Sequence, residues 1–281
     1  MIEKNFRLCA FADEASSSLA GQIEALQRNG ITLLEIRGVD GKNIADMTVN
    51  EVREVKNRLD DAGISVWSIG SPIGKYSLDK PLAPHLEVFK KILDFAEILE
   101  CRRVRMFSFY PGESVSPERA YNQVCEGLFA FCGLTPENIL LCHENEKQIY
   151  GETPEKCLEL LKAFPRLRAV FDPANFVQCG ENTEKAWEKL SPYIEYMHIK
   201  DALPDGTVVP AGFGAGNIPS LLCKYLMHGG EILTLEPHLF DFIGLKALEN
   251  GRDSEHALQF ESQDSAFDAA VGALKKLINE L

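Results

Sequence analysis

Four ionisable side chains in the second half of the chain each follow a short apolar run rich in β-forming residues. They are Glu144 in Leu-Cys-His-Glu-Asn, Asp172 in Val-Phe-Asp-Pro, His198 in Tyr-Met-His-Ile-Lys and Glu236 in Thr-Leu-Glu-Pro-His. Three carboxylates and one imidazole make a mainly oxygen donor set, which suits Mn²⁺, Mg²⁺ or Co²⁺ and also permits Zn²⁺. Without a cation, carboxylates gathered at one point would repel one another. The pattern predicts that these residues bind one divalent metal ion.

Each of these residues also has an ordinary structural interpretation. A single acidic residue after a strand is usually solvated or paired with a base, and a single histidine is often a packed core residue. The metal hypothesis therefore rests on the set, because four such residues on four successive strand ends are hard to explain as solvated charge.

The elements that must position these residues alternate along the chain. Eight β-rich runs are predicted at about 7–13, 31–37, 64–70, 102–110, 138–145, 167–172, 194–200 and 231–236. The runs 31–36 and 138–142 are almost continuously apolar, as expected for parallel strands that are covered on both faces. Between the runs lie amphipathic stretches, such as Leu19, Ile23 and Leu26 before the helix stop Gly30.

This alternation predicts an α/β protein with a single (β/α)₈ TIM barrel over residues 1–281. An open dinucleotide-binding sheet would need GxGxxG after the first strand, but the chain has Phe-Ala-Asp-Glu-Ala-Ser at 11–16. The carboxyl ends of barrel strands meet at one mouth, so the four residues should converge there. The irregular stretch 237–264 is predicted to be a lid or an oligomer contact.

Composition limits the partners. The formal net charge of −13 disfavours binding to nucleic acid. The basic stretch 101–105 is interpreted as a solvated turn at the bottom of the barrel. The eight cysteines lack paired spacing and are expected to be reduced thiols. Because the sequence contains no apolar leader and no membrane-length apolar run, we expect a cytoplasmic protein that does not bind membranes, with a homo-oligomer possible.

Further side chains are candidates for the pocket. Lys200 and His238 follow the last two strands, where they could contact a substrate. Lys200 could instead orient a neighbouring carboxylate or form a structural pair with Asp201 or another acid. Lys75 and Glu35 lie near the ends of the third and second strands, where rim salt bridges are the alternative. The remaining predictions are pocket walls or core positions for Trp67, Phe109 and Tyr110, solvated positions for His85, His228 and His256, and a phosphate cradle or flexible turn in Gly-Phe-Gly-Ala-Gly at 212–216.

Over nearly its whole length the chain resembles the sugar-phosphate isomerase/epimerase superfamily of xylose-isomerase-like barrels, which includes ketose 3-epimerases and inosose dehydratases. The matching segments are Leu-Glu-Ile-Arg-Gly at 34–38, Gly-Ser-Pro-Ile-Gly-Lys at 70–75, His-Glu-Asn at 143–145, Phe-Asp-Pro-Ala-Asn at 171–175, His-Ile-Lys-Asp at 198–201 and Leu-Glu-Pro-His at 235–238.

The resemblance implies a metal that binds two neighbouring oxygens of a sugar or sugar phosphate, with Glu144 and Glu236 acting both as ligands and as acid/base groups. Removal of a proton next to a carbonyl leaves an ene-diolate, whose charge a bound cation stabilises. Return of the proton to the opposite face gives an epimer, and return to the neighbouring carbon gives an aldose-ketose isomer.

The chain departs from the family pattern at two positions. Asn175 stands where sugar 3-epimerases carry a histidine, so it can hydrogen-bond a substrate hydroxyl but cannot titrate. Phe213 stands where many relatives have a polar residue. The alternatives to an isomerase or epimerase are an inosose-type dehydratase, an endonuclease-IV-like hydrolase, which would need additional histidines, and a sugar-binding barrel without turnover.

Overall fold

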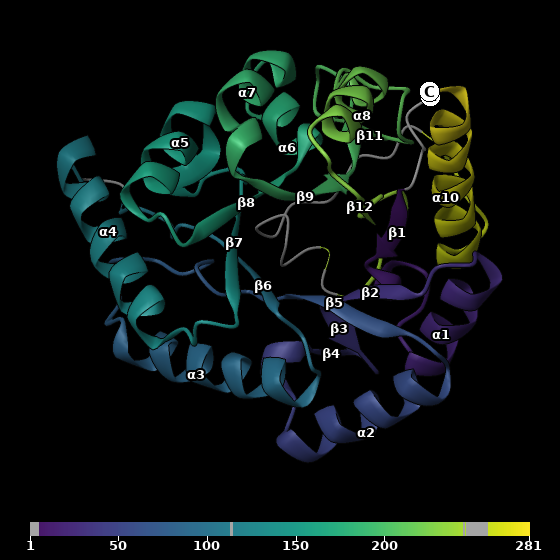
Figure 1. Ribbon diagram of the computed structural model, residues 1–281, viewed down its shortest axis with the longest axis horizontal. Helices are drawn as coiled ribbons and strands as arrows, with labels where there is room; N and C mark the ends of the chain where they lie inside the picture. The colour runs from purple at the N-terminus through teal and green to yellow at the C-terminus, as the bar shows by residue number, and fades with distance from the viewer. Residues whose placement is uncertain (1–5, 113–114, 244, 246–257) are drawn as a thin grey trace.

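Eight parallel strands close into a barrel in the computed structural model, which describes residues 6–112, 115–243, 245 and 258–281 (Figure 1). Around the barrel the strands follow the order β1-β12-β9-β8-β7-β6-β5-β2. All eight overlap the predicted ranges, so the predicted (β/α)₈ barrel is confirmed. Their bounds are β1 Arg7–Ala10, β2 Leu33–Ile36, β5 Ser65–Gly70, β6 Arg103–Met106, β7 Leu140–Glu144, β8 Leu167–Phe171, β9 Ile194–Ile199 and β12 Ile232–Leu235.

Helices surround the barrel, and the last helix lies beside the first helix and strand, where the ring closes (Figure 1). The helices are α1 Leu19–Arg28, α2 Val49–Asp61, α3 Ala83–Ile98, α4 Pro117–Leu134, α5 Pro154–Ala163, α6 Pro173–Gln178, α7 Thr183–Leu190, α8 Ile218–Met227 and α10 Gln263–Glu280. Side chains cap several of their first turns; for example, Thr48 and Glu51 form a capping box at α2. Gly30, the predicted helix stop, adopts positive φ, and so does Gly63, which follows the end of α2.

Two short antiparallel pairs project from the barrel. One pair, β3 (Gly38–Val39) and β4 (Lys42–Asn43), follows β2, and the other, β10 (Asp201–Ala202) and β11 (Val208–Val209), follows β9. The predicted lid or contact segment 237–264 lies partly outside the described residues, at 244 and 246–257.

The strand register brings the carboxyl ends of β7, β8, β9 and β12 to a common level. Glu144, the last residue of β7, pairs with Val170 of β8, and His198 of β9 pairs with Thr234 of β12. Asp172 and Glu236 are the residues that directly follow β8 and β12. The four predicted ligands therefore stand on neighbouring strands at the same end of the barrel.

Two predictions of environment were wrong. Arg105 was expected in a solvated turn, but it is 1% exposed because its side chain points into the barrel, where acidic groups surround it. His85 was expected to be solvated, but it is buried against Tyr76 and its Nε2 accepts the N–H of Gly74. Of the two positions predicted for Phe109, the structure shows the core position.

The expectations for His228 and for the cysteines were met. His228 is exposed, and all eight cysteines are free thiols. His256 lies outside the described residues. Trp67 is partly buried, with the guanidinium of Arg103 3.6 Å from its ring centre, and Tyr110 lies at a pocket. Among the described residues, no helix has the length and apolarity needed to cross a membrane.

Candidate metal centre

The four predicted ligands meet at the mouth of the barrel. Glu144, Asp172, His198 and Glu236 are all buried, and each offers one ligand atom within 4.8 Å of the others. Nδ1 of His198 lies 3.0 Å from Oε1 of Glu144 and 3.2 Å from Oε2 of Glu236. Side chains from β7 and from the end of β12 thus approach the same ring nitrogen.

The two glutamates are held at their other oxygens by buried arginines. Nε of Arg105 lies 3.2 Å from Oε2 of Glu144, and Nη1 of Arg37 donates to Oε1 of Glu236 at 2.8 Å. Each arginine is buried, and its planar guanidinium restricts the orientation of the carboxylate it contacts. Each glutamate therefore keeps the oxygen nearest His198 directed towards the other predicted ligands.

His198 is held from behind by Glu35. Oε2 of Glu35 lies 3.2 Å from Nε2 of His198, while its Oε1 accepts the hydroxyl of Tyr196 at 2.7 Å. A carboxylate at Nε2 keeps a proton there and leaves Nδ1 to face the cluster, as is common for metal-binding histidines. Glu35 was expected to line the pocket or to form a rim salt bridge. It does neither, because its side chain is fully buried beneath the imidazole.

Asp172 is also tied at one oxygen. It is the N-cap of α6, where Oδ1 accepts the N–H of Asn175 at 2.9 Å. Its other oxygen, Oδ2, lies 2.9 Å from Nζ of Lys200. The side chain of Asn175 also reaches the cluster, because its Nδ2 lies 3.4 Å from Oε1 of Glu144 and 2.9 Å from the carbonyl oxygen of Asn145. Each predicted ligand therefore has a neighbour at one atom, while its other atom lies in the cluster, where Lys200 contacts the second oxygen of Asp172.

Lys200 enters the same cluster. Besides its contact with Asp172, its Nζ lies 3.5 Å from Oε2 of Glu236. The alternative pair with Asp201 is not formed. Instead, the carboxylate of Asp201 accepts the N–H groups of Gly212, Gly214 and Gly216 at 2.9–3.0 Å. The glycine-rich loop thus folds around a carboxylate of the chain itself.

The electrostatics of the cluster suit a cation. Burial lowers the pKa of His198, but Glu144, Glu35 and Glu236 together raise it well above its usual value. The pKa of Lys200 is likewise raised, because Asp172 and Glu236 outweigh the effect of burial. Burial raises the pKa of Asp172 to about 6. Nitrogens that hold their protons this firmly indicate a strongly negative potential, which together with the donor set fits one divalent ion.

His238 lies at the edge of the cluster. Its Nε2 is 3.5 Å from Oε1 of both Glu14 and Glu236, and Oε2 of Glu14 accepts its backbone N–H. These three residues form a second close group with three donors, whereas the first group has four. The first group is the one that is consistent with the predicted divalent metal site.

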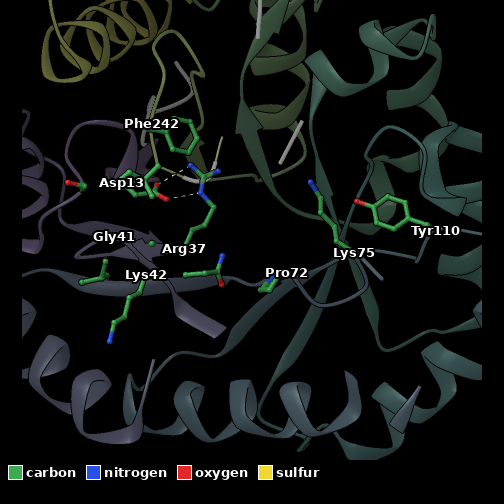
Figure 2. Close-up of a pocket in the computed structure, with 13 residues that line it drawn as sticks. Asp13, Arg37, Gly41, Lys42, Pro72, Lys75, Tyr110 and Phe242 are labelled. Atoms are coloured by element: carbon green, nitrogen blue, oxygen red, sulfur yellow. Dashed lines mark hydrogen bonds and ion pairs between the residues drawn. The ribbon is translucent and has the colours of Figure 1, made fainter. Parts of the chain in front are cut away.

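A pocket of about 450 Å³ lies beside the cluster. Arg37 and Lys75 line it, as does Tyr110, which lies on the same side as Lys75 (Figure 2). Arg37 lines the pocket and also contacts Glu236, so the pocket borders the cluster. Lys75 pairs with Glu146 at 2.9 Å, consistent with the salt bridge that was the alternative to substrate contact.

The cationic side chains around the cluster were not predicted from the sequence. Arg37 stands inside a segment used for the family resemblance, but it was given no role. For Arg105 a signal was present, because Arg103 and Arg105 alternate on one predicted strand and alternate positions share a face. Glu14 and Glu146 were not singled out.

Comparison with known proteins places these observations in context. The model of the family described as "Xylose isomerase-like TIM barrel" matches residues 23–237. No curated protein matches the sequence.

Solved structures share the fold at low sequence identity. A D-allulose 3-epimerase from Methylomonas sp. is 15% identical over 98% of this chain and 99% of its own, with a TM-score of 0.73. The probable 3-DHS dehydratase AsbF of Bacillus anthracis is 16% identical over 96% and 98%, with a TM-score of 0.69. The IOLI protein, solved with a zinc atom, is 16% identical over 98% and 99%, with a TM-score of 0.71. At these identities the likeness establishes the fold.

Proposed function

Because the chain belongs to the xylose isomerase-like TIM barrel family, we propose that it is a divalent-metal-dependent isomerase or epimerase of a sugar or sugar derivative. In this reaction a proton leaves a carbon next to a carbonyl and returns to the opposite face of that carbon or to the neighbouring carbon. Structural neighbours that epimerise D-allulose and D-psicose support this reaction class.

The observation that carries the proposal is the orientation of the four ligand residues. Each is contacted at one atom by a neighbour, and each offers one ligand atom that lies within 4.8 Å of those of the other three. Such support from surrounding groups is typical of sites that must hold a ligand in one geometry. A divalent ion bound there would polarise the carbonyl of the substrate and stabilise the charge that develops on its oxygens.

We assign the proton transfers to Glu144 and Glu236. Their nearer oxygens lie 3.0 and 3.2 Å from the same nitrogen of His198, although the two side chains come from different strand ends. Two carboxylates that reach a common point from different directions can serve the two faces of one carbon, as epimerisation requires.

The proposed substrate contacts surround this point. Oδ1 of Asn175 accepts no hydrogen bond from any described residue and is buried, so it is available to a substrate hydroxyl. Nζ of Lys200 lies among the carboxylates and is placed to donate to a substrate oxygen. His238 and Lys75 stand at the edge of the cluster and at the pocket, where we propose more peripheral contacts.

A dehydratase of the inosose type is the second candidate, and Lys200 is the observation that favours it. A buried ammonium next to the proposed metal ligands is placed to hydrogen-bond a departing hydroxyl and stabilise the charge it develops, a contact that isomerisation does not need. The likeness to a probable 3-DHS dehydratase is consistent with this candidate.

Exchange of substrate hydrogen with solvent tests both candidates. Protein treated with chelator and reloaded with Mn²⁺ is incubated in D₂O with a panel of ketoses, inososes and polyhydroxy ketones that carry aryl or alkyl groups, and NMR and mass spectrometry follow deuterium incorporation and product mass. An isomerase or epimerase gives a deuterated product of unchanged composition, whereas a dehydratase product lacks one water. The absence of both exchange and product across the panel would contradict the proposal.

A further inference from the structure

The glycine-rich loop at 212–216 does not offer a free phosphate site. Its three glycine N–H groups point at the carboxylate of Asp201, which is buried and also accepts the N–H of Ala202. A Cβ on Gly214 would lie 2.3 Å from that carboxylate, so the loop is closely fitted to it. The donors that a barrel commonly gives to a phosphate are occupied here by an anion of the chain itself.

The cations that line the pocket are also paired. Arg37 contacts Asp13, Glu14 and Glu236 at 2.8–3.1 Å, so three carboxylates share one guanidinium. Lys75 pairs with Glu146, and Lys42 pairs with Glu51. A phosphate in this pocket would lose its hydration and meet no uncompensated positive charge.

The rest of the pocket surface is largely apolar. Val39, Pro72, Phe242 and Ile243 line it. Phe242 lies over the guanidinium of Arg37 at 4.7 Å, as Figure 2 shows, and Ile243 is 63% exposed at the rim. A volume of about 450 Å³ falls within the range of pockets that enclose small organic ligands.

We propose that the substrate is not phosphorylated and that its end remote from the metal is uncharged and apolar. Three observations support this: Asp201 occupies the glycine-rich loop, the cations of the pocket are paired, and the rest of the pocket lining is largely apolar. This inference rests on the proposed function, because it takes the metal centre as the place where the polar, carbonyl-bearing end is held. It narrows the substrate class to a carbonyl-bearing polyol that carries an aromatic or aliphatic group.

Three hydroxamates that differ only in their tails provide the test. The hydroxamate group binds a metal through two neighbouring oxygens and does not depend on sugar stereochemistry. Acetohydroxamate has no tail, 3-phenylpropanohydroxamate has an apolar tail, and 3-phosphonopropanohydroxamate has a charged tail. Calorimetry on Mn²⁺-loaded protein should show the phenyl compound binding at least about tenfold more tightly than acetohydroxamate, as expected when a phenyl ring is buried. The phosphono compound should bind no more tightly than acetohydroxamate.

Variants of Ile243 localise the effect to the pocket. Ile243→Asp should remove most of the preference for the phenyl tail and leave the affinity for acetohydroxamate unchanged. Ile243→Lys adds an unpaired cation and should strengthen binding of the phosphono compound a few-fold. Phe129→Asp is the control, because Phe129 is 75% exposed on α4 and is not among the pocket residues.

The outcomes separate this inference from the proposed function. If acetohydroxamate binds only in the presence of metal but the phenyl tail adds no affinity, or the phosphono tail adds more, the apolar substrate class is wrong and the metal centre stands. If no hydroxamate binds, the proposed metal centre is contradicted and the inference falls with it. If Phe129→Asp lowers the phenyl preference as much as Ile243→Asp, the assignment to this pocket is wrong.

Discussion

Nε of Arg105 lies 3.2 Å from Oε2 of Glu144, the oxygen opposite the one that contacts His198. Arg37 stands in the same relation to Glu236. In both pairs a buried guanidinium holds one carboxylate oxygen and leaves the other for the proposed metal. The arginines thus partly compensate a concentration of negative charge that the fold must contain even without an ion.

Replacement of Arg105 by Met should destabilise the metal-free protein. Loss of the guanidinium leaves Glu144 buried without its partner, and breaking a buried ion pair from one side typically costs about 3–5 kcal/mol. Added Mn²⁺ should restore part of this loss, because it supplies positive charge to the same carboxylate. Denaturant unfolding with and without metal measures both effects.

Arg103→Met is the matched control for that experiment. Arg103 precedes Arg105 by two residues on β6 but pairs with Glu195 and is only partly buried. Its loss should cost less, and added Mn²⁺ should not restore the lost stability. Equal unfolding free energies for the Arg105 variant and the unmodified protein would refute the proposed charge compensation.

Glu35 should control metal affinity through His198. Glu35→Ala removes the acceptor at Nε2 and frees the ring to rotate or change tautomer, and such changes around metal ligands typically weaken binding about 10–100-fold. Glu35→Gln keeps an oxygen in place and should bind Mn²⁺ with intermediate affinity. Free Mn²⁺ measured by electron paramagnetic resonance gives the dissociation constants. A change of less than about twofold in the Ala variant would show that Glu35 does not position His198.

The two glutamates should be essential for hydrogen exchange and dispensable for folding. Glu144→Gln or Glu236→Gln replaces a proton acceptor by an amide of the same shape, so we expect exchange in D₂O to fall at least about 100-fold. Circular dichroism should report an unchanged barrel. If both variants retain exchange, the assigned acid/base roles are wrong.

Stability should fall in mild acid, partly because of His85. Burial lowers the pKa of His85 to about 4, and its Nε2 accepts the N–H of Gly74, so the folded state needs the neutral ring. The unfolded chain takes up this proton near its ordinary pKa of about 6.5, so the stability present at pH 7.5 is lost as the pH falls from 6.5 towards 4.

His85→Gln isolates this contribution, since an amide can accept the same hydrogen bond but does not titrate in this range. Between pH 7.5 and pH 5 the variant should lose about 1–2 kcal/mol less unfolding free energy than the unmodified protein. His228→Gln is the control, because His228 is exposed. Identical pH profiles for the His85 variant and the unmodified protein would exclude this contribution.

The fold and the four proposed ligands were predictable because each depends on a local signal combined with one topological rule. Apolar runs separated by amphipathic stretches specify strands and helices, and the closed barrel brings all strand ends to one mouth. Glu144 and His198 are recognisable because they are polar residues at the ends of apolar strands.

The supporting contacts were not predictable because they depend on how far a side chain reaches inside the barrel. Glu35 was expected to be at the rim, but its position within β2 places it beneath His198. Arg105 was predicted to be solvated because basic residues are dense around it in the sequence. It lies instead on the face of β6 that points into the barrel, where it contacts Glu144. The carboxylate of Asp201 accepts N–H groups of the glycine-rich loop that lie 11 to 15 residues later in the chain. The spacing of these residues in the sequence does not indicate such a contact.

Equilibrium titration of chelator-treated protein with Mn²⁺ tests the central claim most directly. The four side chains should bind one ion per chain, and Asp172→Asn and His198→Ala should each weaken that binding at least about tenfold, while Glu195→Gln at the other end of the barrel should leave it unchanged. Failure to bind Mn²⁺, Co²⁺ or Zn²⁺, or unaltered binding in both the Asp172 and His198 variants, would contradict the metal centre.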